Sequence, residues 1–298
     1  MTLHKTTSEQ SIKLLSHFAE ISDHYDGFII DLWGVLHDGV MAYPGAVDCL
    51  RRLKQAGKKI LLLSNAPRRA AVVADGTAKI GFLKDSYDFL HSSGEETWQQ
   101  LYKRSDNWHR RLGTKCLAIF AESDRPFFQG LDLQLVQEPQ HAEFVLAVGI
   151  RNFGDTVDLY ASALKKAQQQ GLPMLCVNPD LEIIRQGKRE ICAGALAQYY
   201  EQIGGEVRYH GKPHPAVYQH ALKLLGGLDK NKILAVGDAL RTDIAGATTM
   251  GLDSLWILGG IHAEGLLLNQ QQGLKQRLVE MAEKAALKPV AGLPRFVW

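Results

Sequence analysis

The chain has 298 residues, which at roughly 100–200 residues per domain predicts two domains or one large one. Hydrophobic residues make up 46% and charged residues 22%, which is enough apolar material for a sizeable core and excludes a wholly disordered chain. Thirty-four Lys and Arg against thirty-two Asp and Glu leave a formal charge of +2, so the basic surface typical of nucleic-acid-binding proteins is not expected.

No apolar run approaches the roughly 18 residues that a membrane span needs, and the first twenty residues lack the apolar core of a secretory signal. The four cysteines form no CxxC pair, which disfavours a metal cluster or a disulfide framework and fits a reducing compartment. We therefore expect a cytoplasmic protein with neither a nucleic-acid partner nor a membrane partner.

Short apolar runs alternate with amphipathic stretches along the chain. The runs at 28–30, 60–63, 89–90 and 233–236 read as buried strands that end where small or polar residues begin. Between them, apolar residues at helical spacing predict helices at 46–55, 70–80 and 216–225. This alternation indicates a Rossmann-like α/β fold, a parallel sheet with helices on both faces.

The middle third repeats the pattern. It predicts strands at 116–120, 144–148 and 174–177, and helices at 156–170 and 193–203. Periodicity alone leaves open whether this block continues the first sheet or forms a separate α/β domain. Beyond it, the stretch 265–287 is predicted as one long helix, followed by an extended tail at 289–298.

In open parallel sheets, ligands bind beyond the carboxyl ends of the strands, so the residues that follow each strand are the candidates for a site. Asp31 directly follows the first run, where a buried carboxylate is costly unless it has a partner or a task. Ser64 follows the second run, and its hydroxyl could hold a phosphate oxygen with Asn65 and Arg68 nearby. An ordinary helix start, a Ser/Asn cap and then Pro67, is the alternative.

Two further segments carry charged residues. Lys212, in the string GKPHP, is a compact positive charge suited to phosphate, or else an exposed loop lysine. Asp238 ends the strand ILAVG, and Asp243 follows five residues later; such a pair suits a hard cation like Mg²⁺, although Gly-Asp turns are common. Taken together and in this order, these residues indicate a phosphate and metal site rather than four unrelated turns.

The set resembles the haloacid dehalogenase (HAD) superfamily, specifically the class IIA branch of large-cap phosphatases of the nucleotide and pyridoxal-phosphate type. The resemblance runs from about Tyr25 to Ile261 and rests on strings in the expected order: DLWGVLHDG…YPGA, LLSNAPRR, VGIRNFGDTVDLYASAL, VNPD, CAGALAQYYEQIGG, GKPHP and GDALRTDIAGA. It implies a Rossmann-like parallel-sheet core with an inserted α/β cap domain.

The resemblance also implies roles for individual residues. Asp31 would attack phosphorus and form an aspartyl-phosphate, with Ser64 and Lys212 holding the phosphoryl oxygens. Mg²⁺ would be bound by Asp31, Asp238 and the backbone carbonyl of Trp33, with Asp243 orienting the ligands. The residues expected to contact the substrate are Ser64, Asn65, Arg68 and Lys212 of the core and Asn178 and Asp180 of the cap.

The same resemblance sets the domain boundaries. Ser64 and Lys212 are 148 positions apart, far more than one helix and one strand require. We therefore expect a discontinuous HAD-like core at 1–92 and 207–298 and an α/β cap at 93–206. The sequence leaves the oligomeric state open. Class IIA relatives often pair through the cap, so a homodimer through the cap is the arrangement to test.

One position departs from the family pattern. The family usually has a second Asp two residues after the nucleophile, acting as a general acid and base, and this chain has Trp33 there. An indole offers an N–H donor that does not titrate usefully; His37 or Asp38 could substitute, or could simply be turn residues. The sequence therefore predicts a Mg²⁺-dependent phosphatase of small phosphorylated metabolites. The alternative is a phosphate-binding or regulatory protein with impaired turnover.

Overall fold

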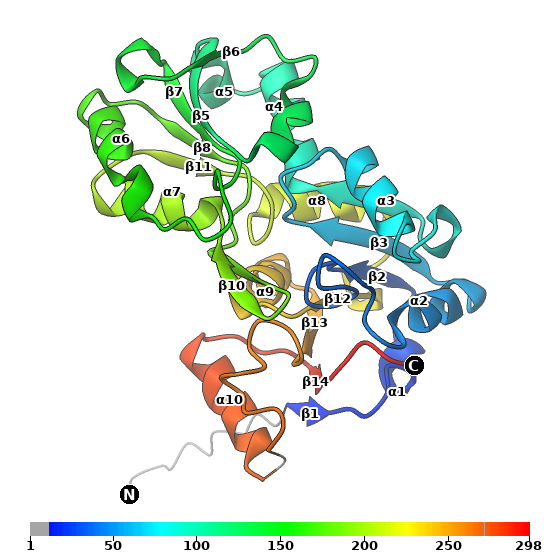
Figure 1. Ribbon diagram of the computed structural model, residues 1–298. Helices are drawn as coiled ribbons and strands as arrows, with labels where there is room; N and C mark the ends of the chain where they lie inside the picture. Colours follow the sequence, from blue (N-terminus) through cyan, green and yellow to red (C-terminus); the bar gives the residue numbers. More distant parts are fainter. Residues whose placement is uncertain (1–11, 271) are drawn as a thin grey trace, which may run out of the picture.

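The computed structural model describes residues 12–270 and 272–298. Figure 1 shows two stacked α/β units, with the blue and orange ends of the chain in the lower unit and the green middle in the upper one. Each unit is built on its own parallel sheet. The middle third therefore forms a separate sheet rather than continuing the first.

The lower unit is organised around seven parallel strands in the order β1-β14-β13-β12-β2-β3-β4. The strands at its centre are continuous apolar runs because both of their faces are covered. The seven strands are β1 (Lys13–Leu14), β2 (Gly27–Ile30), β3 (Lys59–Ser64), β4 (Phe89–Ser92), β12 (Ile233–Gly237), β13 (Asp253–Ile257) and β14 (Ala291–Leu293).

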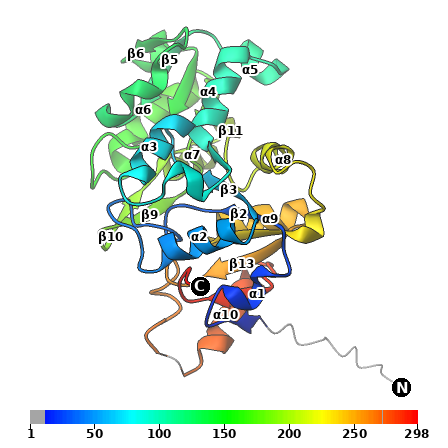
Figure 2. The same ribbon diagram turned by 90° about the vertical axis from the view of Figure 1, so that its right-hand side faces the viewer.

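Helices cover both faces of this sheet. Side chains alternate along a strand, so Phe28 and Ile30 of β2 pack on the face covered by α2, whereas Ile29 packs on the face covered by α8 and α9. The helices of this unit are α1 (Ala19–Ser22), α2 (Ala46–Gln55), α3 (Ala70–Ala78), α8 (Pro215–Leu224), α9 (Ala245–Met250) and α10 (Leu274–Lys284). Figure 2 shows α2 and α9 on opposite sides of the sheet.

The upper unit has a five-stranded parallel sheet in the order β11-β8-β7-β5-β6. Helices α6 and α7 cover one face, where Leu164 and Leu196 are fully buried. Its strands are β5 (Lys115–Ile119), β6 (Gln134–Val136), β7 (Phe144–Ala147), β8 (Met174–Cys176) and β11 (Val207–Tyr209). Its helices are α4 (Ser93–Lys103), α5 (Asn107–Arg111), α6 (Asp158–Gln169) and α7 (Ala193–Gln202).

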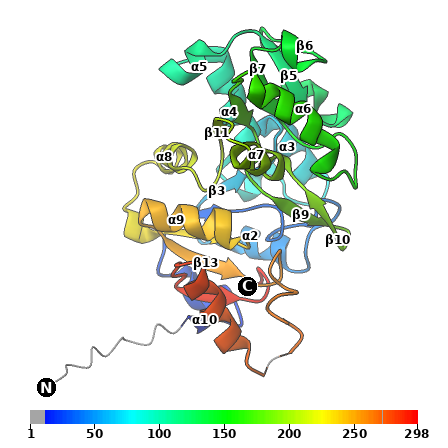
Figure 3. The ribbon, with the colours of Figure 1, turned by 90° about the vertical axis from the view of Figure 1, so that its left-hand side faces the viewer.

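A two-stranded antiparallel hairpin links the units in space. Strands β9 (Glu182–Arg185) and β10 (Lys188–Ile191) are joined by Gln186 and Gly187, which both have positive φ. Figures 1 and 3 show this hairpin reaching from the upper unit down to the lower one. Short helical segments complete the description: 3₁₀ at Lys84–Ser86, Glu122–Phe128, Pro139–His141 and Lys230–Lys232, and π at Leu240–Ile244.

The predicted fold class, a Rossmann-like core with an inserted α/β cap, is confirmed. The exact boundaries stay a proposal, and residues 1–11 of the predicted core lie outside the described residues. The strand β11 hydrogen-bonds to β8 of the upper sheet, so we propose a second boundary after residue 209 instead of 206. Within the described residues, no helix is both long and apolar enough to cross a membrane.

The single long helix predicted at 265–287 is wrong. Among the described residues of this stretch, only Leu274–Lys284 is helical, and this helix begins after Gly273, which has φ 73°. Residues 261–269 form turns that place Leu266 in the same buried cluster as Leu274 and Leu278. Of the predicted tail, Ala291–Leu293 forms β14, which pairs in parallel with β13.

Candidate active site

Four charged side chains meet at the carboxyl end of the core sheet. Asp31 follows β2, Asp238 follows β12, and Asp243 lies in the π turn after β12. Lys212 reaches them from the loop after β11, which contains the cis peptide bond Lys212–Pro213. All four are buried, with exposed fractions of 3–8%. The sequence placed these residues in one site, and the structure brings them together.

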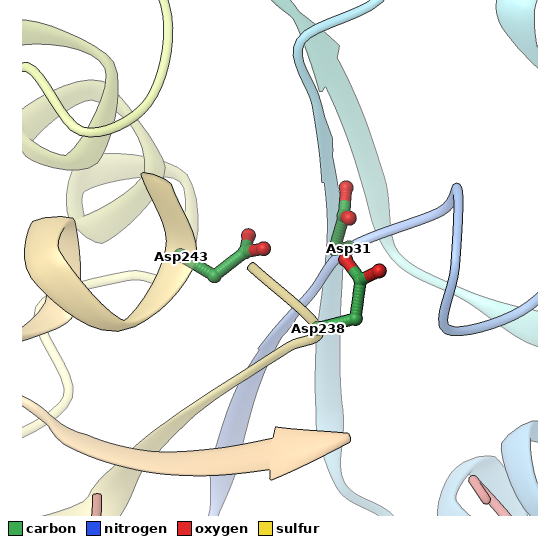
Figure 4. Close-up of side chains that lie close together, drawn as sticks. All are labelled: Asp31, Asp238 and Asp243. Carbon is green, nitrogen blue, oxygen red and sulfur yellow. The ribbon is translucent and has the colours of Figure 1, made fainter. Parts of the chain in front are cut away.

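The three carboxylates form a compact oxygen cluster. One oxygen from each of Asp31, Asp238 and Asp243 lies within 4.8 Å of the others (Figure 4). Lys212 Nζ donates to Asp31 Oδ1 at 2.6 Å and to Asp243 Oδ1 at 2.7 Å. Two of the three carboxylates therefore share one ammonium group, and Asp238 has no ion pair with it.

This charge imbalance shows in the pKa values. Burial raises the pKa of Asp31 well above its usual range, against the attraction of Lys212, and burial with the nearby Asp243 also raises the pKa of Asp238. Burial opposes the charge of Lys212, but Asp243 and Asp31 outweigh it, so its pKa is raised. The site as built carries an excess of negative charge that a cation would neutralise.

The donor set fits a hard divalent cation, because all three candidate ligands are carboxylates and Mg²⁺ prefers oxygen. Backbone and glycine positions hold these ligands in place. The N–H of Ile261 donates to Asp238 Oδ2 at 2.7 Å, and the N–H of Ala239 donates to Asp243 Oδ2 at 3.2 Å. A Cβ at Gly260 would come within 1.9 Å of Asp238 Oδ2, so glycine is required there.

Gly260 and Ile261 were not predicted as site residues. They follow β13, a strand that the apolar string SLWIL could have indicated. Asp31 and Asp238 were identified because each follows a strand of the sheet. The same criterion, applied to the strand that ends before Gly260, would have identified these two residues as well.

Three of the predicted substrate contacts surround Lys212. Asn65 Oδ1 accepts the N–H of Lys212 at 2.8 Å, and Asn65 Nδ2 donates to Asp180 Oδ1 at 2.9 Å. Asp180 belongs to the cap, is half-buried, and has its pKa raised by burial. Asn178 Oδ1 in turn accepts the N–H of Asp180 at 3.0 Å. Cap and core are therefore joined by hydrogen bonds beside the lysine.

The other two predicted contacts, Ser64 and Arg68, are not among the residues that line the cavity of the carboxylates. Ser64 is buried, and its Oγ accepts the N–H of Ala66 at 3.1 Å. Arg68 does not point to the carboxylate cluster; its Nε pairs with Asp124 Oδ1 of the cap at 2.7 Å. Ser64 and Arg68 both line a cavity that is separate from the one lined by Asp31 and Lys212.

Two cavities meet at Trp33. The inner cavity, of about 90 Å³, is lined by Asp31, Lys212 and the other carboxylates. The outer cavity, of about 280 Å³, lies between core and cap and is lined by Ser64 among others. Trp33 and Ile183 line both, and Trp33 Nε1 donates to the carbonyl of Ile184 in the cap hairpin at 2.9 Å.

Neither candidate replacement for the missing acid lines either cavity. His37 is buried, its Nδ1 accepts the N–H of Gly39 at 2.9 Å, and burial lowers its pKa to about 4. Asp38 Oδ1 accepts the N–H groups of Val40 and Met41, both at 2.9 Å. Both side chains stabilise the turn that follows Asp31, which favours the turn interpretation of these two residues.

Comparison with known proteins agrees with this geometry. Residues 28–134 match the family model described as haloacid dehalogenase-like hydrolase, and residues 209–280 match a HAD-hydrolase-like model. The crystal structure of a haloacid dehalogenase-like hydrolase from Brucella suis 1330 is 31% identical, with a TM-score of 0.82 over 95% of this chain and 100% of that one. The chain belongs to the haloacid dehalogenase-like hydrolases.

More distant relatives share most of the chain. Chronophin of Rattus norvegicus is 28% identical over 242 residues, which are 80% of this chain and 77% of that protein. Ribonucleotide monophosphatase NagD of Escherichia coli K12 is 28% identical over 245 residues, 79% of this chain and 88% of that protein. These relatives, together with the inserted cap, confirm the class IIA assignment.

Proposed function

We propose that this hydrolase is a Mg²⁺-dependent phosphatase of small phosphorylated metabolites that uses Asp31 as its nucleophile. The observation that carries the proposal is the cluster of Asp31, Asp238, Asp243 and Lys212 at one buried sheet edge. The monophosphatase relative supports the reaction class, and the modest volume of the outer cavity, about 280 Å³, supports a small substrate.

In this proposal Asp31 attacks phosphorus, the ester bond breaks, and the phosphoryl group is held as an aspartyl-phosphate until water releases it. Lys212 and Ser64 bind phosphoryl oxygens, with Asn65 fixing the backbone of Lys212. When bound at Asp31, Asp238 and the backbone carbonyl of Trp33, Mg²⁺ would neutralise the charge that gathers between carboxylate and phosphate. Asp243 would orient Lys212, to which it is hydrogen-bonded.

Trp33 gives this mechanism a particular feature. Its indole cannot protonate the leaving oxygen, so that oxygen departs as an anion or takes a proton from water. The same feature keeps a second candidate function open: a protein that binds a phosphorylated ligand without turning it over.

The test is a hydrolysis assay of the full chain on a panel of phosphate esters, with Mg²⁺ and in excess chelator, combined with trapping of phosphate on Asp31 by acid quench and mass spectrometry. We expect activity with Mg²⁺ only, and less than about 1% of it in Asp31→Asn, because an amide is a poor nucleophile. Asp229→Asn, the same change at an exposed position of the core domain, should be fully active.

Two results would count against the proposal. Full activity in chelator would exclude the metal, and an active Asp31→Asn would show a different nucleophile. If the parent neither hydrolyses any ester nor becomes phosphorylated at Asp31, the binding-protein alternative takes its place.

A further inference from the structure

The outer cavity has the position of a leaving-group site. It shares Trp33 and Ile183 with the inner cavity, so an ester whose phosphate lies between Asp31 and Ser64 extends its remaining atoms into the outer cavity. This placement rests on the proposed function. The residues that line the outer cavity then indicate which kind of leaving group fits there.

Much of that lining is apolar. Its largest apolar side chains come from the loop after Asp31, the cap loop at 148–153 and the cap hairpin: Trp33, Val148, Ile150, Phe153, Ile183 and Ile191. Phe153 is 54% exposed, and the guanidinium of Arg185 lies 6.0 Å from the centroid of its ring. An exposed aromatic ring at the entrance and apolar walls inside favour a planar, apolar body over a sugar-like one.

The charged residues of the lining are predominantly positive. The lining contains three arginines, Arg68, Arg151 and Arg185, and two carboxylates. One of the carboxylates, Asp124, is paired with Arg68 at 2.7 Å. Arg151 and Arg185 are exposed, and neither forms an ion pair with a carboxylate in the part of the chain that the structure describes. Two arginines therefore remain available to a ligand.

The second carboxylate, Glu190, has a structural partner. It is buried at 8% exposure, and its Oε2 accepts the N–H of Gly154 at 2.8 Å. This bond joins strand β10 of the hairpin to the loop that carries Arg151, and Arg185 ends the neighbouring strand β9. Glu190 thus holds the two supports of the arginines together rather than neutralising either one.

We propose that the outer cavity selects phosphate esters whose leaving group combines a planar apolar body with an anionic substituent, bound by Arg151 and Arg185. A guanidinium offers paired N–H donors that match a carboxylate, and such charge-assisted bonds are the strong ones. At a partly exposed entrance the attraction is screened by salt, so the preference should weaken as ionic strength rises.

The test compares three aryl phosphates of similar size with the full chain and Mg²⁺. The substrates are 4-carboxyphenyl, 4-carbamoylphenyl and 4-(aminomethyl)phenyl phosphate, which carry a negative, a neutral and a positive substituent on the same type of leaving group. We expect kcat/KM for the carboxylate to exceed that for the amide by about tenfold, with the amine lowest. The gap should shrink at high salt.

Variants locate the preference. Arg151→Gln and Arg185→Gln should each reduce the carboxylate-to-amide ratio several-fold, and the double variant should remove it. Arg110→Gln provides a matched control, because Arg110 is exposed on the cap helix α5 and lines neither cavity. It should leave both the ratio and the activity unchanged.

A second readout separates this inference from the proposed function. Binding of the same three esters to Asp31→Asn, measured by calorimetry, reports the charge preference without turnover. Equal affinities and equal rates, or a preference for the amine, would overturn the anionic leaving group while leaving the phosphatase intact. Preferred binding of the carboxylate without hydrolysis of any ester by the parent would support the cavity assignment and overturn the phosphatase.

Discussion

Trp33 is the residue at which this chain departs most clearly from its family. It stands two positions after Asp31, where an acid is expected, and its ring packs against Gly39, where a Cβ would come within 2.0 Å of the indole. The ring has an edge-on contact with His37, at 5.7 Å between centroids. Trp33 therefore shapes the cavities but supplies no titrating proton.

The first prediction is that the parent favours aryl over alkyl phosphates, because a phenolate leaves without a proton and an alkoxide does not. The gap in kcat/KM should reach the roughly 10²–10⁴ that general acid catalysis contributes. Trp33→Asp should narrow the gap by raising the rate on alkyl phosphates. Steady-state kinetics on phenyl phosphate and a simple alkyl phosphate measures it.

Trp33→Asn is the matched control, because it has the same size as Asp and no acidic proton. If Asn narrows the gap as much as Asp does, the gain comes from space and the proton argument fails.

His91, at the end of β4, is a second residue with a measurable consequence. It is 4% exposed, its Nε2 has no hydrogen-bond partner among the described residues, and its ring lies 4.4 Å from that of His220. Burial, with a smaller contribution from His220, lowers its pKa to about 4. The folded state therefore disfavours the charged imidazole.

From this we predict acid sensitivity with a defined sign. In the unfolded chain His91 binds its proton near pH 6.5, and in the folded chain only near pH 4. The contribution of neutral His91 to the free energy of unfolding is therefore fully present above about pH 6.5 and is lost as the pH falls towards 4. Between pH 7 and 5 this one group should lower the free energy of unfolding by about 2 kcal/mol. Denaturant titrations at the two pH values measure the loss.

His91→Leu should reduce that loss by about the same amount. His24→Leu, the same change at an exposed position, should leave the pH dependence as it is. Identical pH dependence in the parent and His91→Leu would show that His91 is not the group responsible.

At the scale of elements, regular patterns were predictable and irregular ones were not. Helix α2 begins and ends at the predicted residues, because its apolar positions recur at helical spacing. The helix predicted at 265–287 failed because periodicity does not show where turns interrupt a pattern: Leu267 has φ 49° and Gly273 has φ 73°. The short strands β9 and β10 are half-exposed and gave no apolar run at all.

The candidate site follows the same division. Asp31, Asp238 and Lys212 were predictable, because the ends of parallel strands meet at one edge of a sheet. The contact between Trp33 and Ile184 was not, because it joins positions 151 residues apart and depends on how the cap closes on the core. Local sequence patterns do not predict how two domains pack, because that packing depends on contacts between residues far apart in the chain.

The hairpin contact yields the next prediction. Trp33→Phe keeps an aromatic wall but removes the hydrogen bond to the carbonyl of Ile184, which should destabilise the closed cap by about 0.5–1.5 kcal/mol. If substrate binds the closed form, KM should rise by roughly 2- to 10-fold with little change in kcat. Steady-state kinetics on an aryl phosphate separates the two constants.

Trp98→Phe removes a comparable bond, from Trp98 Nε1 to the carbonyl of Gln129 at 3.0 Å, on a part of the cap that lines neither cavity. It should leave KM unchanged. If KM rises for both variants, or for neither, the hairpin contact does not specifically control substrate binding, and the prediction is contradicted.

For the molecule as a whole, closure buries charge. Two hydrogen bonds, from Asn65 to Asp180 and from Arg241 to the carbonyl of Pro179, join core and cap beside the carboxylate cluster. The ion pair of Arg68 and Asp124 joins them beside the outer cavity. A buried cluster with excess negative charge opposes folding until a cation binds. Pairing of two chains through the cap, which the sequence left as a hypothesis, would leave this argument unchanged.

The last prediction is therefore that Mg²⁺ stabilises the fold itself, independently of any substrate. A ligand at 100 times its Kd adds about 2.7 kcal/mol to the folded state, which should raise the Tm by roughly 5–10 °C for a core of this size. Calorimetric scans of the full chain in chelator and in saturating Mg²⁺ measure the shift.

Asp238→Asn should melt higher than the parent in chelator, because it removes one of the repelling charges, and its Tm should respond less to Mg²⁺. Asp229→Asn, at an exposed position, should keep the full response. A Tm that is indifferent to Mg²⁺ in the parent would mean that the carboxylates are neutralised by protons rather than by a metal, because their raised pKa values leave only these two ways to relieve the repulsion.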